Sequence, residues 1–254
     1  MRGKLEFPID GGVVKVDSLA LWPDLGIVGG REPRYAIARK FAAQPDHLAK
    51  LFEGGSRHCW GRHQLLLRAG DPATSLHRIT SGVVAASIAM PDARRQIIVF
   101  LFPGDPCGLV QSNGRYAFDY EAITETTTCA VDMSHVRKLT GSDPDVAEAL
   151  EEKMSRTDAR LTEQLVALGQ LNAKERVVFF LRRLSRSYAE RGMPTQPLLL
   201  PMTRLDIADH LGIRLETLSR VLSGLKRRQL IDLQNANTVV LNGRTSEVLG
   251  AALG

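Results

Sequence analysis

Residues 203–228 read TRLDIADHLGIRLETLSRVLSGLKRR and predict two helices joined by a tight turn. Thr203 and Asp206 form a capping-box pattern, in which a hydroxyl and a carboxylate bind backbone amides that the first turn of a helix leaves free. Ala208 and Gly212 follow at the fifth and ninth positions after Thr203. A small residue lets two helices cross closely, and glycine allows the positive φ that the turn needs. This spacing predicts a helix-turn-helix.

The second of these helices is expected to carry polar side chains on the face that its apolar residues leave free. Glu216, Ser219 and Arg220 stand at i, i+3 and i+4 and therefore point the same way. Arginine can bind guanine N7 and O6 together, glutamate can accept from cytosine N4, and serine can bond several base edges. The pattern predicts a base-reading set in a helix that enters the major groove. The predicted core beneath the two helices consists of Leu205, Ile207, Leu211, Ile213, Leu218, Val221, Leu222 and Leu225.

The segment ETLSR at 216–220 lies within a longer frame of characteristic segments. Together with MTRLDIADHLG at 202–212, NAKER at 172–176 and AERG at 189–192, it resembles the FNR/FixK branch of the CRP/FNR transcription regulators. The resemblance covers residues 46–254 and is strongest after residue 172. It implies a homodimeric activator without enzymatic activity. Such a protein binds double-stranded DNA at palindromes with TTGAT-like half-sites and works with RNA polymerase.

Six residues around the two helices are expected to contact the DNA backbone. Family members usually carry Ser or Thr as the N-cap of the reading helix, whereas this chain has Arg214, a poor cap whose charge is unfavourable at a helix N-terminus. A contact between Arg214 and a phosphate would offset that cost, which is a hypothesis. The full set of expected backbone contacts is Thr203, Arg204, Arg214, Thr217, Lys226 and Arg227.

The composition favours a globular protein that meets a polyanion at its C-terminal third. The chain has 254 residues, of which 44% are hydrophobic and 24% charged, and a formal net charge of +5. From residue 172 onward there are 13 Lys and Arg against 7 Asp and Glu, whereas the preceding part has 20 against 21. This distribution is expected if the C-terminal third binds DNA.

The sequence gives no sign of secretion or of a membrane span. Its three cysteines are widely separated, so a disulfide framework is excluded. No apolar run reaches the roughly 18 residues of a transmembrane helix, and the N-terminal residues lack the apolar core of a signal peptide. A reducing cytoplasm is the expected location.

The chain is expected to be an α+β protein of four parts. These are an N-terminal extension at 1–45, a β-roll sensor domain at 46–141, a dimerisation helix at 142–171 and a winged helix-turn-helix domain at 172–254. A short helix is expected at 45–51 and strands at 65–67, 75–80, 83–90, 96–102 and 127–132. Short strands with glycine at their corners suggest an antiparallel roll. The segments RAGD at 68–71, ITSG at 79–82 and FPGD at 102–105 resemble the roll of the CRP/FNR group, a cyclic-nucleotide-binding-domain-like double-stranded β-helix.

A long amphipathic helix is expected from Pro144 to about Leu171. Its length of about 27 residues exceeds that of a usual globular helix, and Thr157 and Gln164 fill two places of its apolar pattern. The resemblance implies that the helix pairs with its copy in a second subunit, and packing on the roll is the alternative. The predicted dimerisation residues are Leu150, Met154, Leu161, Leu168 and Leu171.

Asn172 and Glu175 predict the capped start of the next helix, which is expected to end near Gly192. Asn172 is therefore the expected hinge between sensor and reader. The segments 230–233 and 239–241 are expected to pair as a two-stranded wing.

The roll lacks the residue patterns of two known effector sites. Cyclic-nucleotide-binding members of the family carry Gly-Glu and a later Arg-Ser/Thr pair, whereas this chain has Gly108-Leu109 and Arg115-Tyr116. Cyclic nucleotide binding is therefore not expected. An iron–sulfur cluster held by four cysteines of one subunit is excluded because the chain has three cysteines.

Two sensing alternatives remain open, and no metal site or cofactor is evident. A thiol-based redox sensor would use Cys107, which stands in a predicted turn. A haem or metal would need its ligands from the set His47, His58, Cys59, His63 and His77. A cupin-like metalloprotein is disfavoured because its His-x-His pair is absent, and an adaptor without DNA activity would make the base-reading set fortuitous.

Overall fold

The computed structural model describes residues 11–15, 27–28, 32–33, 36–40, 47–92, 94–108, 113–235 and 237–242. The chain divides into two units, Met1–His47 and Leu48–Gly254. In the first unit, strand β1 (Gly11–Lys15) pairs antiparallel with β4 (Ala36–Lys40), and β2 (Ile27–Val28) pairs antiparallel with β3 (Glu32–Pro33). All other described elements contribute to the second unit.

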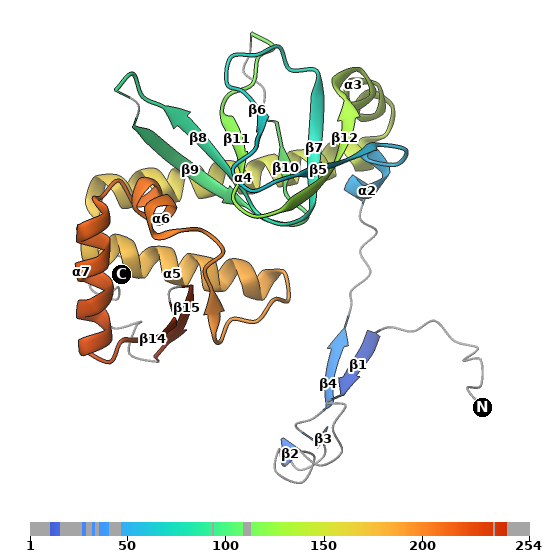
Figure 1. Ribbon diagram of the computed structural model, residues 1–254. Coiled ribbons are helices and arrows are strands. Elements are labelled where there is room, and N and C mark those ends of the chain that lie inside the picture. Colours follow the sequence, from blue (N-terminus) through green and yellow to red (C-terminus); the bar gives the residue numbers. More distant parts are fainter. Residues whose placement is uncertain are drawn as a thin grey trace. The chain divides into compact units, whose positions relative to one another are not determined.

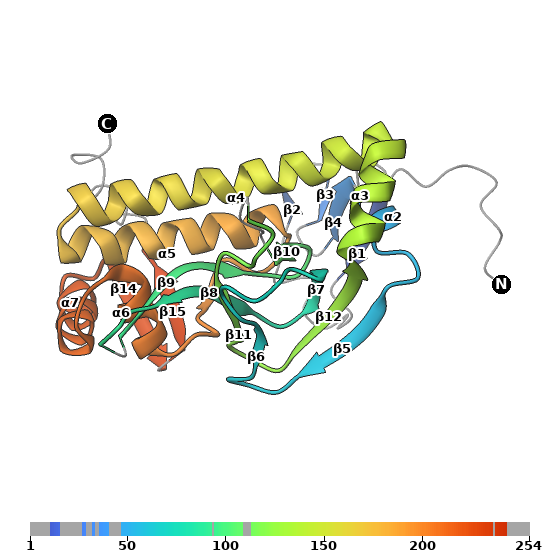
Figure 2. The same cartoon turned by 90° about the horizontal axis from the view of Figure 1, so that it is seen from above.

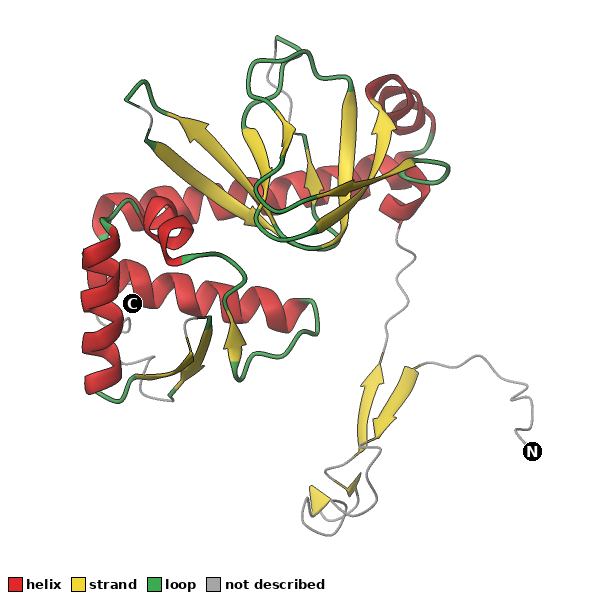
Figure 3. Cartoon of the chain, in the orientation of Figure 1, coloured by secondary structure: helices red, strands yellow, loops and turns green. Residues whose placement is uncertain are grey.

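Two four-stranded antiparallel sheets form the roll of the second unit (Figures 1 and 3). One sheet has the strand order β10-β7-β12-β5, and the other has the order β6-β11-β8-β9. Helix α2 (His47–Leu51) precedes the roll. The strands are β5 (Ser56–Trp60), β6 (Leu65–Leu67), β7 (Ser75–Ser81), β8 (Val84–Ala89), β9 (Arg95–Leu101), β10 (Pro106–Cys107), β11 (Asp119–Ala122) and β12 (Thr126–Asp132).

The short helix and the five predicted strands of the roll are confirmed, and β5, β10 and β11 lie outside the predicted set. Strand β5 is at a sheet edge and its side chains are mostly exposed, so it lacks the apolar alternation of a half-buried strand. The turn between β7 and β8 depends on Gly82, which has a φ of +84°. A Cβ there would lie 2.4 Å from the carbonyl oxygen of Glu125, so no other residue fits without rearrangement.

Helix α4 (Pro144–Gln170) is the long helix that the sequence predicts, and it has 27 residues. It follows α3 (Met133–Ser142), and the Asp143 side chain caps it by accepting from the backbone amides of Asp145 and Val146. Figure 2 shows α4 running along the roll and beside α5 (Ala173–Glu190). The predicted capping box at the start of α5 is confirmed, since Asn172 and Glu175 bond each other's backbone amides.

Some of the residues predicted to lie at the dimer interface of α4 instead face their own subunit. Leu171, beyond the helix end, is 5% exposed, and Leu150 and Leu161 pack partly against the roll, so part of the predicted dimerisation set is already covered within the subunit. Gln164, which occupies one place of the predicted apolar pattern, is buried within the subunit, whereas Leu165 beside it is 72% exposed. Helix α4 therefore packs on the roll along one face, while Met154 and Leu165 remain exposed on another.

The described residues of the C-terminal part form three helices and a small sheet (Figure 1). Helix α6 (Arg204–Leu211) and helix α7 (Leu215–Arg227) follow α5. The wing strands β14 (Ile231–Asn235) and β15 (Thr238–Leu241) pair antiparallel as predicted, and β13 (Leu198–Leu199) adds a third strand beside β15. The predicted wing of two strands is therefore incomplete.

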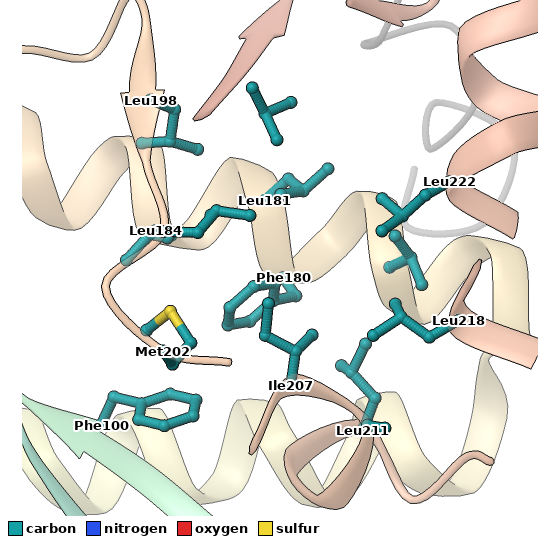
Figure 4. Packing of buried hydrophobic residues seen from close by; sticks show 14 of the residues in the cluster. Phe100, Phe180, Leu181, Leu184, Leu198, Met202, Ile207, Leu211, Leu218 and Leu222 are labelled. Carbon is teal, nitrogen blue, oxygen red and sulfur yellow. The ribbon is translucent and has the colours of Figure 1, made fainter. Parts of the chain in front are cut away.

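One apolar core joins the roll to the helix-turn-helix. Phe100 of β9 belongs to the same buried cluster as Phe180 of α5 and Ile207 of α6 (Figure 4). Most of the predicted core beneath α6 and α7 is confirmed, but Leu205 is 53% exposed and does not belong to it. The core continues across both domains, so the position of α6 is tied to strand β9 of the roll.

Candidate nucleic-acid interface

The start of helix α6 is built by a reciprocal cap. The Thr203 backbone amide donates to Asp206 Oδ2 over 2.8 Å, and the Asp206 amide donates to Thr203 Oγ1 over 3.1 Å. Ala208 is 1% exposed at the crossing with α7, and Gly212 takes the left-handed conformation with a φ of +61°. The geometry predicted for the helix-turn-helix is thus present in this structure.

Helix α7 separates an apolar face from a polar one. Leu218, Leu222 and Leu225 are buried against the rest of the domain. Glu216 and Arg220 are exposed and Ser219 is half-buried, at the spacing that places them on one face. Within the described part of the chain, neither Glu216 nor Arg220 has a side-chain hydrogen bond or ion pair, so both are available to a ligand.

The N-terminus of α7 lacks a side-chain cap. Arg214 occupies the N-cap position and makes no capping hydrogen bond. The free amides and the positive end of the helix dipole therefore face solvent together with an exposed guanidinium. An anion such as a DNA phosphate would satisfy both.

The remaining candidate backbone contacts lie at both ends of the motif. Thr203 and Arg204 are at the start of α6, and Thr217 is in the first turn of α7. Lys226 and Arg227 are in the last turn of α7, roughly 15 Å along the axis from Glu216. Lys226 also lies 3.6 Å from Asp232 in the wing, an exposed pair. Of the predicted cations, Arg204 begins α6, Arg214 precedes α7, and Lys226 and Arg227 end α7.

Strand β9 holds α6 through Arg95, a residue that sequence reasoning missed. Its guanidinium donates to Asp206 of α6, to Asp209 Oδ2 over 2.9 Å and to Glu121 Oε2 over 2.8 Å. Burial by itself would lower the pKa of Arg95, but Asp209, Glu121 and Asp206 together raise it. The sequence holds no signal for this cluster, because Arg95 of the roll and its partners in α6 are separated by 111 and 114 residues.

His210 is a second such contact and is fully buried. Its Nδ1 lies 3.0 Å from the Ile97 carbonyl oxygen and its Nε2 lies 2.8 Å from Nη2 of Arg183. The carbonyl can only accept and the guanidinium can only donate, so His210 must carry its proton on Nδ1. Burial, with repulsion from Arg183, lowers the pKa of His210 to about 3, which keeps the ring neutral.

Two glutamines complete the attachment of α6. Gln164 of α4 donates to the His210 carbonyl oxygen over 2.6 Å, and Gln96 of β9 donates to the Asp209 carbonyl oxygen over 2.7 Å. These carbonyls belong to the last turn of α6, which leaves such groups without partners inside the helix. The first helix of the motif is therefore bonded at both ends to elements outside it.

The structure argues against Cys107 as the redox thiol. Cys107 is fully buried, and burial together with the nearby Asp105 carboxylate raises the pKa of its thiol to about 12. A thiol protonated at neutral pH and shielded from solvent is unreactive. The position in a predicted turn was misleading, because Cys107 lies in strand β10 paired with His77 of β7.

The candidate haem or metal ligands form no three-ligand set, although the rings of His58 and His77 lie 5.7 Å apart between centroids. Within the described ranges, no group of three or more His, Cys, Asp and Glu side chains could hold a metal ion. His77 bonds Ser75 and Thr128, and burial lowers its pKa to about 4. His63 Nδ1 instead lies 2.9 Å from Glu121 Oε1.

No described helix has both the length and the apolar character of a membrane span.

Family models match both domains of the second unit. Residues 57–143 match the cyclic nucleotide-binding domain, and residues 175–244 match the Crp-like helix-turn-helix domain. Residues 1–44 match the NAD-dependent DNA ligase adenylation domain, in a segment whose side chains lie outside the described residues.

Relatives with similar sequences are transcription regulators. The chain is 35% identical to the nitrogen fixation regulation protein FixK of Azorhizobium caulinodans, over 83% of this chain and 84% of that protein. It is 31% identical to the transcriptional activatory protein AadR of Rhodopseudomonas palustris, over 79% of this chain and 84% of that protein. A match of 31% identity to the anaerobic regulatory protein of Pasteurella multocida covers 68% of this chain but 64% of that protein.

A solved structure shares the fold of both domains. The structure of FixK2 from Bradyrhizobium japonicum superposes with a TM-score of 0.70 at 30% sequence identity. The match covers 78% of this chain and 96% of that chain.

Proposed function

Because this chain belongs to the CRP/FNR family of DNA-binding transcription regulators and is not an enzyme, we propose that it acts as a homodimer on a palindromic operator. In this proposal residues 46–141 form the sensor, 142–171 the dimerisation helix and 172–254 the reader. The name of the relative AadR contains the words transcriptional activatory, which supports activation of transcription. Work with RNA polymerase is part of the proposal.

The observation that carries the proposal is the exposed polar face of α7. Glu216, Ser219 and Arg220 lie there beside an uncapped helix N-terminus, opposite the buried leucines. In a major groove, Arg220 would bind a guanine, Glu216 would accept from a cytosine, and Ser219 would bond a neighbouring edge. A half-site such as TTGAT offers these base pairs.

Phosphate contacts would orient this face. Thr203 and Arg204 at the start of α6 and Arg214 and Thr217 at the start of α7 are close to the groove edges in such a docking. Lys226 and Arg227 would meet the backbone near the wing. These contacts carry no sequence information but contribute most of the salt-dependent affinity.

The dimer would form along α4, with a corrected set of residues. Met154, Leu161, Leu165 and Leu168 share one stripe of the helix at roughly 100° per residue, and their spacing follows a coiled-coil repeat. Met154 is 41% and Leu165 is 72% exposed, so a second copy would bury them. Leu150 extends this stripe, whereas Leu171 is already buried within the subunit.

The roll is proposed to bind no cyclic nucleotide. Arg115 donates to the Gly70 carbonyl oxygen, and the Tyr116 hydroxyl bonds the Ser75 backbone, so neither side chain is arranged to grip a phosphate. Leu109, at the place of the family's glutamate, lies outside the described residues. Haem remains a proposal without a supporting contact in the structure.

A binding experiment tests the proposal. Purified protein is titrated into a fluorescent duplex with two inverted TTGAT half-sites spaced about one helical turn apart, roughly 34 Å between centres. A duplex with half a turn added between the half-sites and a scrambled duplex serve as controls. The proposal expects tight binding to the first duplex alone. Equal affinity for the first and second duplexes would contradict a dimer that reads both half-sites.

A further inference from the structure

A small cavity lies where strand β9, helix α4 and helix α5 meet, outside the helix-turn-helix. Its volume is about 40 Å³. Three aromatic rings, Phe100, Phe102 and Phe180, contribute to its walls, together with the polar side chains of Arg160, Arg183 and Ser187. The space suffices for a few water molecules or for one small ion.

Arg183 brings a positive charge to this cavity without a carboxylate partner. Two of its five N–H groups donate to protein, one to the Arg160 carbonyl oxygen over 3.3 Å and one to Nε2 of His210 over 2.8 Å. Both acceptors are neutral. Burial lowers the pKa of Arg183 to about 10, the Glu163 charge opposes this shift, and the Arg160 charge adds to it.

The nearest buried carboxylate is already shared by other cations. Asp105 accepts from Arg160 over 3.1 Å and from Arg191 over 2.6 Å. Lys153 is also close enough for Asp105 to influence its pKa, which burial lowers. Within the described residues, therefore, Arg183 has no salt bridge, and the cluster around the cavity holds more cations than carboxylates. Arg183 is half-buried, and its N–H groups that bond no protein atom are available to an anion.

We propose that this cavity binds a small monovalent anion with a planar carboxylate, the size of formate, on the guanidinium of Arg183. A planar carboxylate can accept two parallel N–H bonds from one guanidinium, which a spherical ion cannot do. The Ser187 hydroxyl can donate a further hydrogen bond, and the aromatic walls suit the C–H end of the ion. A volume of about 40 Å³ favours the smallest carboxylates.

The test is a titration of sodium formate into the full-length protein, followed by calorimetry at constant ionic strength. Formamide, which has the same shape without the charge, is the matched ligand control. Formate should give a saturable isotherm with one site per chain, and formamide should give none. Because the titration contains no DNA, its result is separate from the proposed operator binding.

Variants then assign the site. Arg183→Gln should weaken formate binding by about tenfold or more, since it removes a charge-assisted pair. Arg182→Gln is the matched control, because Arg182 is exposed on the same helix and should bind as wild type does. Arg183→Lys keeps the charge but loses the fork, and it should lie between the two. Arg183→Lys also replaces Arg183→Gln as the test variant if Arg183→Gln does not fold.

Four results would overturn the proposal. One is the absence of saturation with formate up to about 100 mM, and another is equal binding of formamide and formate. The third is formate affinity in Arg183→Gln, or in Arg183→Lys if the former does not fold, that equals wild type. Tighter binding of chloride than of formate would refute the planar carboxylate as the ligand.

Discussion

Replacing Arg95 by alanine removes the guanidinium that joins strand β9 to helix α6, and three carboxylates lose their shared partner. Asp206 is 1% exposed, and Glu121 and Asp209 have side chains 21% and 23% exposed. Breaking a buried pair on one side costs about 3–5 kcal/mol, because the other charge stays buried. Arg95 itself is 27% exposed and Asp206 keeps two hydrogen bonds from Thr203, so we expect a smaller loss of about 2–3 kcal/mol.

The assay is urea unfolding of wild type and variant at pH 7, with the free energy of unfolding obtained by linear extrapolation. Arg94→Ala is the matched control, because Arg94 is the neighbouring arginine and, among the described residues, forms its ion pair with exposed Asp92. Its stability should be close to that of wild type, since solvent-exposed pairs contribute little. A double-mutant cycle with Asp209→Asn isolates the contact between the two domains and should give a clear coupling energy.

The reasoning is refuted if Arg95→Ala destabilises the protein no more than Arg94→Ala does. It is also refuted if Arg95→Ala and Asp209→Asn are fully additive, because the ion pair would then contribute nothing to the junction. Arg95→Lys should recover part of the loss, since an ammonium keeps the charge but cannot reach three carboxylates at once.

Further predictions concern DNA, assembly and pH. Arg220→Ala should weaken DNA binding by about 1–3 kcal/mol per half-site and relax the preference at one base pair. Lys226→Ala should weaken binding to all duplexes alike and lower the salt slope by about 1. If Arg220→Ala lost affinity for specific and scrambled DNA in equal proportion, Arg220 would not belong to the base-reading set. Leu165→Glu should shift the protein from dimer to monomer in sedimentation velocity. The control Leu199→Glu should stay dimeric, because Leu199 is 53% exposed but lies outside α4. A Leu165→Glu variant that remains dimeric would contradict dimerisation through α4. The pKa of His210 is about 3 in the folded protein and about 6.5 in the unfolded chain, so unfolding takes up a proton at any pH between these values. The free energy of unfolding should therefore fall below pH 6.5, by roughly 1.4 kcal/mol per pH unit from this residue. Urea unfolding between pH 7 and pH 5 should show a shallower pH dependence in His210→Gln, and an unchanged dependence would contradict the buried neutral ring.

The apolar pattern of α4 shows where sequence reasoning was insufficient. A three-to-four spacing identifies an amphipathic helix, and it located α4 correctly at Pro144–Gln170. It does not say which of two adjacent stripes faces the subunit itself. Gln164 was taken as a filler of the dimer stripe, yet it is buried because its amide bonds α6, and Leu165 is exposed instead. That choice depends on a helix 40 residues further along the chain.

Some site residues are positioned by neighbours in the sequence, and others by contacts with distant segments. The capping boxes at Thr203 and Asn172 and the left-handed Gly212 are settled within a few residues, because helix termini need partners for their own amides and carbonyls. The sequence alone therefore determined the helix-turn-helix, the long helix and the polar face of α7. Only the tertiary structure decided that Arg95 and Gln96 hold α6, that His210 is a neutral buried link and that Cys107 is inert. These depend on burial and on contacts between segments far apart in the sequence, 113 residues for Gln96 and Asp209, which no local pattern encodes.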